Sequence, residues 1–415
     1  MKVGDVANEG AAPYGKPLDG IRVLAAEQMQ ALPYATQLLA RLGADVVKVE
    51  PISGESGRGA QPSMRDPDGR VVGATFLRNN LGKRSIALDL KSERGRDLFL
   101  DLVPRFDVVA ENFKAGTMDR FGLGYDVLAA RHPAVIYLSI SGFGASGSPY
   151  SSWPAYAPIV EAMSGIYEYL NPTGLPPRAA PVGALGDISA ALFASIGVLA
   201  ALRHRDATGE GQQVDIAMYD SAVAMTDIVM NLASLGQPKQ PFPKHFILDT
   251  FRAADGWFVM QLVREHQFAP LAHVVGRPEW IDDPRLATRE SWGQHLEDII
   301  RPGVEAWAAN HSMVEASKEL TAAGVAAGPC FHSSDVITDA HLDRRNMIVE
   351  MDRVDGVEDP VLIPGNPVKL SKMAEGPETR VPWVGEHTVT LLREELGLSE
   401  SEVAHLLEGG VIAET

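Results

Sequence analysis

Short apolar runs alternate with amphipathic segments through the first third of the chain. The apolar runs, rich in Val and Ile, lie at 21–26, 45–50, 85–90, 107–112 and 134–141, and helix-like segments lie between them at 33–43 and 92–103. Strands that are apolar on both sides and separated by helices are typical of a parallel sheet covered on both faces. The pattern therefore predicts βα repeats and the α/β fold class.

The middle of the chain carries its longest uncharged apolar run. This run, 188–202, has 15 residues, which is short of the roughly 18 that indicate a membrane span, so we expect a buried helix. A strand at 213–218 and a helical run at 219–236 follow, and the proline-containing segment 237–245 is a candidate linker.

The remaining pattern predicts smaller elements. The segment 251–263 is typical of a hairpin with Asp255-Gly256 at its turn. Further on, we expect a strand near 348–354, a helix at 388–397, and a last helix that begins at Ser399, with Glu402 completing a capping box.

Composition narrows the class of protein. A chain of 415 residues with 45% hydrophobic and 22% charged residues is a folded protein, and its length indicates two domains. Its 54 acidic and 37 basic residues give a net charge of -17, which disfavours nucleic acid as a partner. The single cysteine rules out an intrachain disulfide, and with no apolar leader at the start we expect a cytoplasmic protein that does not enter a membrane.

Two motifs suggest chemistry that their context does not support. The string GFGASG at 142–147 matches the glycine pattern of a dinucleotide site, but Pro149 and Pro154 interrupt the helix that such a site needs. The histidines are scattered without metal-ligand spacing, so no metal site is expected. Cys330 lacks a matching general base, and we expect it to be a small buried hydrophobic residue rather than a nucleophile.

Asp187 stands directly before the apolar helix and has two compatible interpretations. It can be the N-cap of that helix. A carboxylate with the ordinary pKa of about 3.9 is also ionised at neutral pH and can attack an activated acyl group without a general base. The local pattern alone favours the cap.

Segments along nearly the whole chain together carry a resemblance to one family. They are PLDGIRVL (17–24), PYATQLLARLGADVVKVEP (33–51), NNLGKRSIALDLKSERGRDLFLDLV (79–103), ENFKAGTMDRFGLGYDVL (111–128), YLSISGFGASGSPY (137–150), GALGDISAALFASIGVLAAL (183–202), GVAAGPCFHSSDVITD (324–339) and GEHTVTLLREELGLSESEVAHLLEGGVI (385–412). In order and spacing the chain resembles the class III CoA-transferases of the formyl-CoA transferase or CaiB/BaiF type.

The resemblance implies an acyl-CoA:carboxylate CoA-transferase in which Asp187 is the covalent nucleophile and Gln30 lies near the reacting atoms. The substrates would be an acyl-CoA and a small carboxylic acid, with coenzyme A as substrate rather than as a tightly bound cofactor. The residues implied for the CoA site share the first βα loops or lie close to them: Arg58, Lys83, Arg84, Asn112, Met118 and Arg120. Arginine and lysine suit the phosphates of CoA, and methionine suits its adenine.

The resemblance also predicts the architecture. We expect a Rossmann-like large domain with a smaller α+β domain: a large CoA-binding part at 17–225, a small domain with linkers at 226–330, and a segment at 331–415 that returns to the large domain. Two subunits are expected to interlock as a homodimer.

Two other functions stay open. An α-methylacyl-CoA racemase would resemble the same family, but it needs a second acid/base, a histidine, where this chain has Tyr156 followed by Ala157. A phenol with a pKa near 10 is a poor base at neutral pH. A noncatalytic CoA-binding protein on the same scaffold is the other alternative, and the presence of both Asp187 and Gln30 argues against it.

Overall fold

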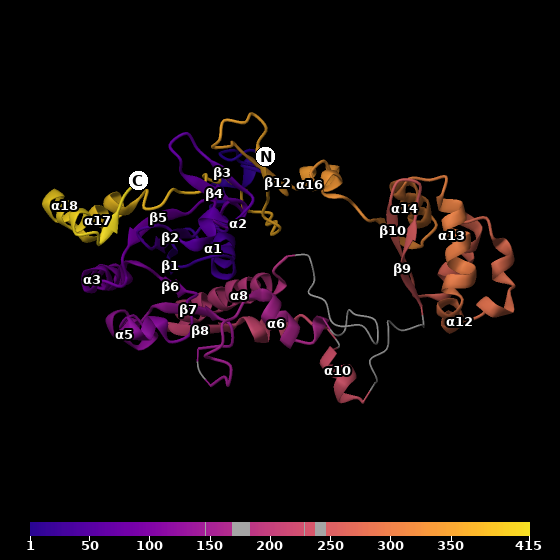
Figure 1. Cartoon of the computed structure of the whole chain (residues 1–415), viewed down its shortest axis with the longest axis horizontal. Coiled ribbons are helices and arrows are strands. Elements are labelled where there is room, and N and C mark those ends of the chain that lie inside the picture. The colour runs from indigo at the N-terminus through magenta and orange to yellow at the C-terminus, as the bar shows by residue number, and fades with distance from the viewer. Residues whose placement is uncertain (146, 168–182, 228, 237–245) are drawn as a thin grey trace. The chain divides into compact units, whose positions relative to one another are not determined.

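The computed structural model describes residues 1–145, 147–167, 183–227, 229–236 and 246–415. The chain divides into two compact units (Figure 1). Among the described residues, the first unit comprises those within 1–167, 183–230 and 340–415, and the second comprises those within 231–339. The chain thus leaves the first unit, forms the second and returns. The predicted linker at 237–245 lies outside the described residues, and the predicted domain boundaries stay a prediction.

The described part of the first unit is built on a seven-stranded sheet with the strand order β14-β5-β2-β1-β6-β7-β8. Every neighbouring pair is parallel except the pair of β14 with β5 at one edge. The strands are β1 (Arg22–Ala26), β2 (Asp45–Glu50), β5 (Arg84–Leu88), β6 (Val108–Glu111), β7 (Ile136–Ser141), β8 (Gln212–Ala217) and β14 (Ile412–Ala413). This confirms the predicted α/β class and its parallel sheet.

Helices bury both faces of this sheet. Along β1, Val23 and Ala25 join one core while Leu24 and Ala26 join the other, which is the two-sided burial that continuous apolar strands require. The first core is closed by α1 (Ala31–Arg41), α6 (Ala157–Met163), α8 (Leu185–Thr208) and α9 (Met218–Ala224). The second is closed by α3 (Glu93–Leu102), α4 (Thr117–Arg120), α5 (Tyr125–Arg131), α17 (Thr388–Leu396) and α18 (Glu400–Glu408).

The predicted apolar helix is longer than its uncharged run. Helix α8 has 24 residues, beginning before the run and continuing beyond it to Thr208. Its length and composition would suffice to cross a membrane, but half of its most apolar window is buried inside the protein. Ala190, Ala194 and Val198 belong to the core, so α8 is the central packing helix of this unit.

The second unit is an antiparallel sheet with helices. The hairpin β9 (Ile247–Arg252) and β10 (Trp257–Leu262) confirms the predicted one, and β11 (Ala326–Pro329) pairs with the other edge of β10. Its core is rich in aromatic residues, including Phe251, Phe258 and Trp292. The helices are α11 (Phe268–Val274), α12 (Arg289–Gln294), α13 (Arg301–Ala308), α14 (Met313–Ala322) and α15 (Ser333–Val336), and α10 (Val229–Ser234) spans the division between the units.

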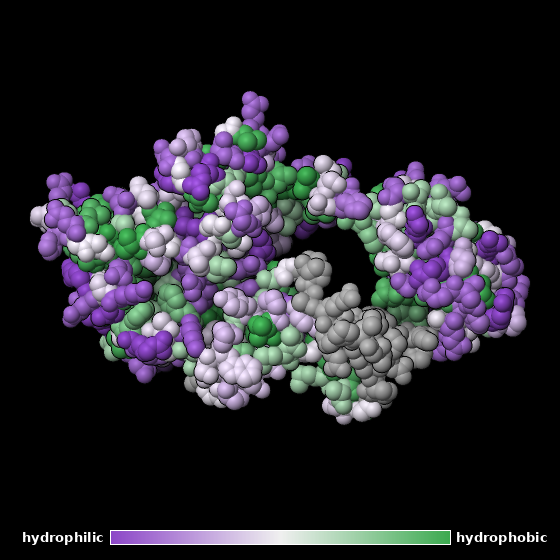
Figure 2. Space-filling model, viewed as in Figure 1, coloured by the Kyte–Doolittle hydropathy of each residue, from purple (hydrophilic) through white to green (hydrophobic). Residues whose placement is uncertain are grey.

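Smaller elements complete the first unit. They are β3 (Ser63–Arg65), β4 (Val71–Gly73), α2 (Ala74–Asn79), α16 (Ala340–Arg344), β12 (Ile348–Met351) and β13 (Val361–Pro364). The predicted capping box at the last helix is confirmed, because Ser399 accepts from the Glu402 amide while the Glu402 carboxylate accepts from the Ser399 amide. Hydrophilic residues cover much of the visible surface of both units (Figure 2).

Candidate active site

The sheet of the first unit has a topological switch point between β1 and β6. The chain runs from β1 to β2 on one side of β1 and later returns to place β6 on its other side. At such a point the loops that follow the two strands diverge and leave a crevice at the carboxyl edge of the sheet. Here those loops are Glu27–Gln30 and Asn112–Gly116.

A cavity of about 330 Å³ lies at this edge. Its walls come from the loops after β1, β6, β7 and β8, from the segment before α6 and from the start of α8. The lining residues are Gln28, Met29, Gln30, Ala31, Asn112, Phe113, Lys114, Ala115, Ile140, Ser141, Gly142, Phe143, Gly144, Ser151, Trp153, Pro154, Ala155, Tyr156, Asp187 and Met218. The structure therefore brings together three predicted site residues: Asp187, Gln30 and Asn112.

The loop that carries Gln30 is held from two sides. The Asn112 side chain accepts from the Gln28 amide and donates to the Gln28 carbonyl, both at 2.9 Å. Met29 has a φ of 62°, an unusual conformation for a residue with a side chain, and its amide donates to Glu55 Oε2 at 3.1 Å. Gln30 is thus presented to the cavity by a fixed loop immediately before α1.

Asp187 is the third residue of α8 rather than its N-cap. The helix begins at Leu185, and the capping position belongs to Ala184, which makes no side-chain cap. The prediction that Asp187 caps the helix is therefore wrong. The uncharged run begins at residue 188, but the helix itself already begins at Leu185. The first turn of a helix is still a favourable place for a negative charge.

The environment of Asp187 changes its acidity. Burial, first, and the nearby charge of Glu161, second, raise the pKa of Asp187 to about 6. The ordinary pKa expected from the sequence is therefore wrong, because the fold withdraws this carboxyl group from water beside a second carboxylate. At pH 7.5 most molecules still carry ionised Asp187, and the ion is more basic than an exposed aspartate.

Aromatic residues form one wall of the cavity. Phe143 packs against Tyr150 and Trp153, with ring centroids 5.5 and 6.4 Å apart. Trp153 is 51% exposed and Tyr156 is 69% exposed, so these rings are open to an incoming molecule. Sequence reasoning missed this wall, although the aromatic residues between 143 and 156 stand close together in the chain.

Lys114 is a second residue that sequence reasoning missed. It lines the cavity, and its ammonium donates to the Ser152 carbonyl at 2.6 Å. Its position two residues after Asn112, in the same loop, was the available signal. Lys114 supplies a positive charge beside the Asp187 cavity.

Arg58 and Lys83 are buried and already engaged within the protein. Arg58 forms a two-point ion pair with Glu50, at 2.7 and 2.6 Å, and donates to the Pro382 carbonyl. Lys83 donates to Glu27 at 2.7 Å, and burial, as the largest cause, lowers the pKa of Lys83 to about 8. Neither residue lines the Asp187 cavity.

Arg84 points to the opposite edge of the sheet. It forms an ion pair with Asp45, the first residue of β2, whereas the cavity lies where the strands end. Sequence alone could not show this direction, because the partner Asp45 comes from another strand, β2.

Met118 and Arg120 lie on α4, next to the cavity rather than in it. Met118 is buried and lines a second cavity of about 210 Å³, which shares Ala115 with the first. Arg120 is exposed and donates to the Thr117 hydroxyl at 2.8 Å.

The structure tests two other predictions, which concern the glycine string and the burial of Cys330. No helix opens within 148–156, after the glycine string, so the stated objection to a dinucleotide site holds. Cys330 is exposed in the second unit, and the expectation that it is buried is wrong. Within the described residues there is no cluster of three or more side chains suited to a metal ion.

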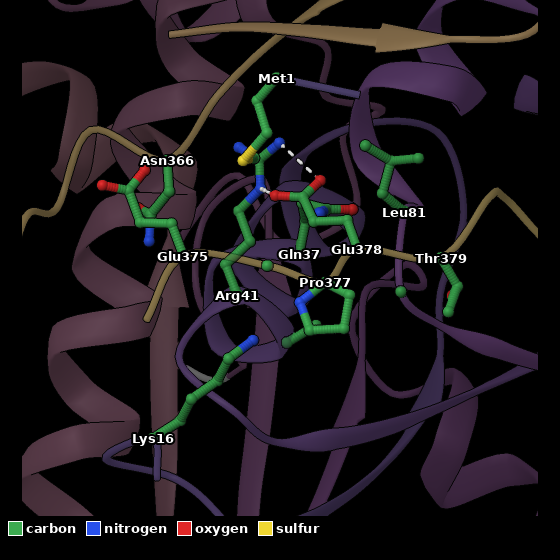
Figure 3. A pocket seen from close by; sticks show the side chains of 13 residues that line it. Met1, Lys16, Gln37, Arg41, Leu81, Asn366, Glu375, Pro377, Glu378 and Thr379 are labelled. Carbon is green, nitrogen blue, oxygen red and sulfur yellow. Dashed lines mark hydrogen bonds and ion pairs between the residues drawn. The ribbon is translucent and has the colours of Figure 1, made fainter. Parts of the chain in front are cut away.

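A separate cavity of about 110 Å³ lies elsewhere in the first unit (Figure 3). There Arg41 and Glu378 form an ion pair at 2.9 Å, and Gln37 is 1% exposed. This cavity shares no lining residue with the one that holds Asp187, so it is not part of the candidate active site.

Comparisons with known proteins agree with this α/β fold. The model of CoA-transferase family III matches residues 18–388, and the chain belongs to this family. It is an enzyme of the CoA-transferase class, whose substrates are CoA thioesters.

Named relatives span nearly the whole chain. A succinyl-CoA:mesaconate CoA-transferase of Haloarcula hispanica is 37% identical, covering 91% of this chain and 96% of its own length. A formyl-CoA:oxalate CoA-transferase of Streptomyces avermitilis is 34% identical, covering 96% of this chain and 100% of its own. Among solved structures, a CaiB/BaiF family protein from Brucella suis is 32% identical with a TM-score of 0.82, covering 92% of this chain and 100% of its own.

Proposed function

We propose that this enzyme transfers CoA from an acyl-CoA donor to a carboxylic acid acceptor through covalent intermediates on Asp187. The observation that carries the proposal is the position of Asp187 in the first turn of α8, inside the same cavity as Gln30 and Asn112. A carboxylate ionised at neutral pH, partly withdrawn from water and facing a cavity can act as a nucleophile toward a thioester.

In the proposed sequence, Asp187 attacks the thioester carbonyl. The C–S bond breaks, CoA leaves as its thiolate, and an aspartyl-acyl anhydride forms. The thiolate then attacks the aspartyl carbonyl, which breaks the anhydride C–O bond, releases the donor acid as a carboxylate and leaves an aspartyl-CoA thioester. The acceptor carboxylate reverses both steps and departs as the new acyl-CoA, with no water consumed.

Each attack places a negative charge on a carbonyl oxygen. We propose that the Gln30 side-chain amide and backbone N–H groups in the first turn of α8, other than that of Gly186, stabilise this charge, because preorganised donors at a water-poor site stabilise an oxyanion strongly. The fixed loop from Gln28 to Gln30 supports this role, since little reorganisation is needed during the reaction.

CoA would extend from this centre over the neighbouring loop. Asn112 and Lys114 line the cavity, Met118 lines the neighbouring one, and Arg120 is exposed on the same helix as Met118. This supports a path on which phosphates meet Lys114 and Arg120 and the adenine meets Met118. The cationic groups of Arg58, Lys83 and Arg84 are already paired with carboxylates. The contact of these three residues with CoA stays a prediction.

The test is to trap the intermediate. The enzyme is incubated with an acyl-CoA in the absence of acceptor, treated with borohydride or hydroxylamine, digested and mapped by mass spectrometry. Succinyl-CoA and formyl-CoA are suitable donors, with mesaconate and oxalate as acceptors, because the named relatives act on them. Modification at Asp187 is the expected result; an unmodified Asp187 peptide together with an acylated Cys330 would replace the scheme with thiol catalysis.

A racemase fits the cavity less well. Proton exchange at an α-carbon needs two acid/base groups, and no histidine is among the described residues that line the cavity. Tyr156, at the position where a racemase would carry its histidine, is mostly exposed. Incubating a chiral 2-methylacyl-CoA in deuterated water distinguishes the two functions, because a transferase incorporates no deuterium at the α-carbon.

We further propose an interlocked homodimer that works in the cytoplasm. Leu192, Ile196 and Leu199 form an exposed apolar stripe along α8, with 38–61% of each residue accessible, and stripes of this kind mark interfaces. The chain also leaves the first unit and returns to it. Sedimentation at micromolar concentration should give twice the chain mass; a stable monomer would contradict the dimer.

A further inference from the structure

A second carboxylate lies directly behind the proposed nucleophile. Glu161, on α6, is only 3% exposed. One of its oxygens accepts a hydrogen bond from the Gly186 amide at 3.0 Å, and the other accepts from the Tyr167 hydroxyl. Because Gly186 precedes Asp187, Glu161 is bonded to the backbone that carries the nucleophile.

Close packing makes this connection rigid. A Cβ atom on Gly186 would lie 2.7 Å from Val160 Cγ2 and 3.1 Å from Ala157 Cα. The first turn of α8 therefore rests on α6 at a distance that only glycine permits. Glu161 and Asp187 are held on two elements that cannot separate without losing this contact.

The charge of Glu161 acts on Asp187. The nearby charge of Glu161 and burial, which is the larger cause, together raise the pKa of Asp187 to about 6. Other polar groups on this side are Lys114 and Tyr156, which line the cavity, and Tyr219 on α9, whose hydroxyl donates to a main-chain carbonyl of α6.

We infer that Glu161 is a positioning residue that fixes the first turn of α8 and activates Asp187 for attack by electrostatic repulsion. The inference rests on the proposed nucleophilic role of Asp187. Two neighbouring carboxylates in a poorly solvated place repel each other. When Asp187 donates its electron pair to the acyl carbon and the C–S bond breaks, the negative charge moves to the CoA sulfur and the repulsion ends.

Replacement of Glu161 by glutamine tests this role. Glu161→Gln keeps the shape and an oxygen that can accept from Gly186, but it removes the charge. Without the repulsion, Asp187 becomes a weaker base, and a weaker base is a poorer nucleophile. We expect kcat at pH 7.5 to fall about 3- to 10-fold and the acid limb of the kcat profile to move about one pH unit lower, with the KM for acyl-CoA unchanged.

Two further variants make the result specific. Glu161→Asp keeps the charge but shortens the side chain, so its kcat should be lower than that of the wild type. The acid limb of its pH profile should shift less than the acid limb of Glu161→Gln. Glu93→Gln removes one charge from an exposed site on α3 and should leave both quantities unchanged. If Glu161→Gln fails to fold, a Glu161→Asp variant with wild-type kcat and profile overturns the inference.

The inference and the proposed function fail in different ways. If Asp187→Asn keeps its turnover, the nucleophile is wrong and the inference falls with it. If Asp187→Asn is inactive while Glu161→Gln keeps both the wild-type kcat and the wild-type acid limb, the inference alone is wrong. Titration of ¹³C-labelled aspartate carboxyls, with Asp187→Asn used to assign the signal, measures the effect of Glu161 without turnover.

Discussion

The side-chain amide of Asn112 pairs with the backbone of Gln28 across the switch point of the sheet, accepting from its N–H and donating to its C=O at 2.9 Å each. This pair of hydrogen bonds resembles the pair that two neighbouring strands form, although β1 and β6 have already ended at this point. The loop that presents Gln30 is thus locked to the loop that begins the predicted CoA path.

Removal of this amide should lower both kcat and the stability of the fold. Asn112→Ala leaves the N–H and C=O of Gln28 without their partner, and each hydrogen bond contributes about 1 kcal/mol to stability. Because the loop that presents Gln30 loses this support, we expect kcat to fall by about tenfold. Asn112→Asp keeps the acceptor and loses the donor, and should give an intermediate loss. Steady-state assays check both variants, and Asn310→Ala, at an exposed site in the second unit, is the control. Wild-type kcat in Asn112→Ala would show that the loop does not need this lock.

Asp187→Asn should abolish transfer and stabilise the fold. The raised pKa means that ionised Asp187 costs the folded state free energy, by about 1–3 kcal/mol above pH 6. Because the folded pKa lies above the unfolded one, this penalty is absent at pH values below the unfolded pKa and grows as the pH rises to the folded value. Thermal melts should therefore give a higher Tm for the variant at pH 7.5 and a small difference near pH 4. Equal melting temperatures at pH 7.5 would contradict the buried environment.

Gly186→Ala should disturb the junction between α6 and α8. The added Cβ would meet Val160 and Ala157 at 2.7 and 3.1 Å, and overpacking of this kind costs about 1–3 kcal/mol. We expect a lower Tm together with a loss of kcat, since Asp187 is the next residue. Gly197→Ala is a matched glycine on α8: its Cβ would meet the Val214 side chain at 2.6 Å, far along the helix from Asp187. It should lower the Tm with less effect on kcat.

Substitution of Lys83 should lower stability, whereas substitution of Arg120 should lower the affinity for CoA. Lys83→Met removes one of two buried lysine partners of Glu27, and Lys48 remains 3.6 Å from the same carboxylate. We expect stability to fall by about 1–3 kcal/mol, which chemical denaturation would measure. Arg120→Ala changes an exposed residue, so stability should change by less than about 0.5 kcal/mol while the Kd for CoA, measured by calorimetry, rises several-fold. An Arg120→Ala variant with unaltered affinity would remove this residue from the proposed path.

The apolar runs predicted the parallel sheet because its strands are buried on both faces. In β2, for example, successive side chains point to opposite faces, and nearly all of them are buried. Even Lys48 in DVVKVE is fully buried, yet the strand is still predicted correctly, since valines flank it. The start of α8 was misplaced because Leu185 and Gly186 carry no capping signal, and the helix depends there on contact with α6.

Contacts between distant segments are what the sequence leaves out. Arg58 and Lys83 have the residue types of a phosphate site, but each is already paired with a buried carboxylate. Glu50, the partner of Arg58, is 8 residues away, and Glu27, the partner of Lys83, is 56 residues away. Glu161 carries no signal in the sequence, because its hydrogen bond with the Gly186 amide joins residues that are 25 positions apart. The type of a residue shows which ligand its side chain could bind, whereas its ion-pair and hydrogen-bond partners in the fold determine whether the side chain is available for that ligand.

The path of the chain through its two units imposes an order on biosynthesis. Helices α17 and α18 cover one face of the main sheet, and β14 closes its edge, but all three come from the last part of the chain. On the ribosome, the strands from β1 to β8 emerge first and wait with that face partly bare while the whole second unit is made. Exposed apolar strands of this kind are prone to aggregation. Segments from before and after the second unit therefore build one domain, and its sheet is fully covered only after the second unit has been made.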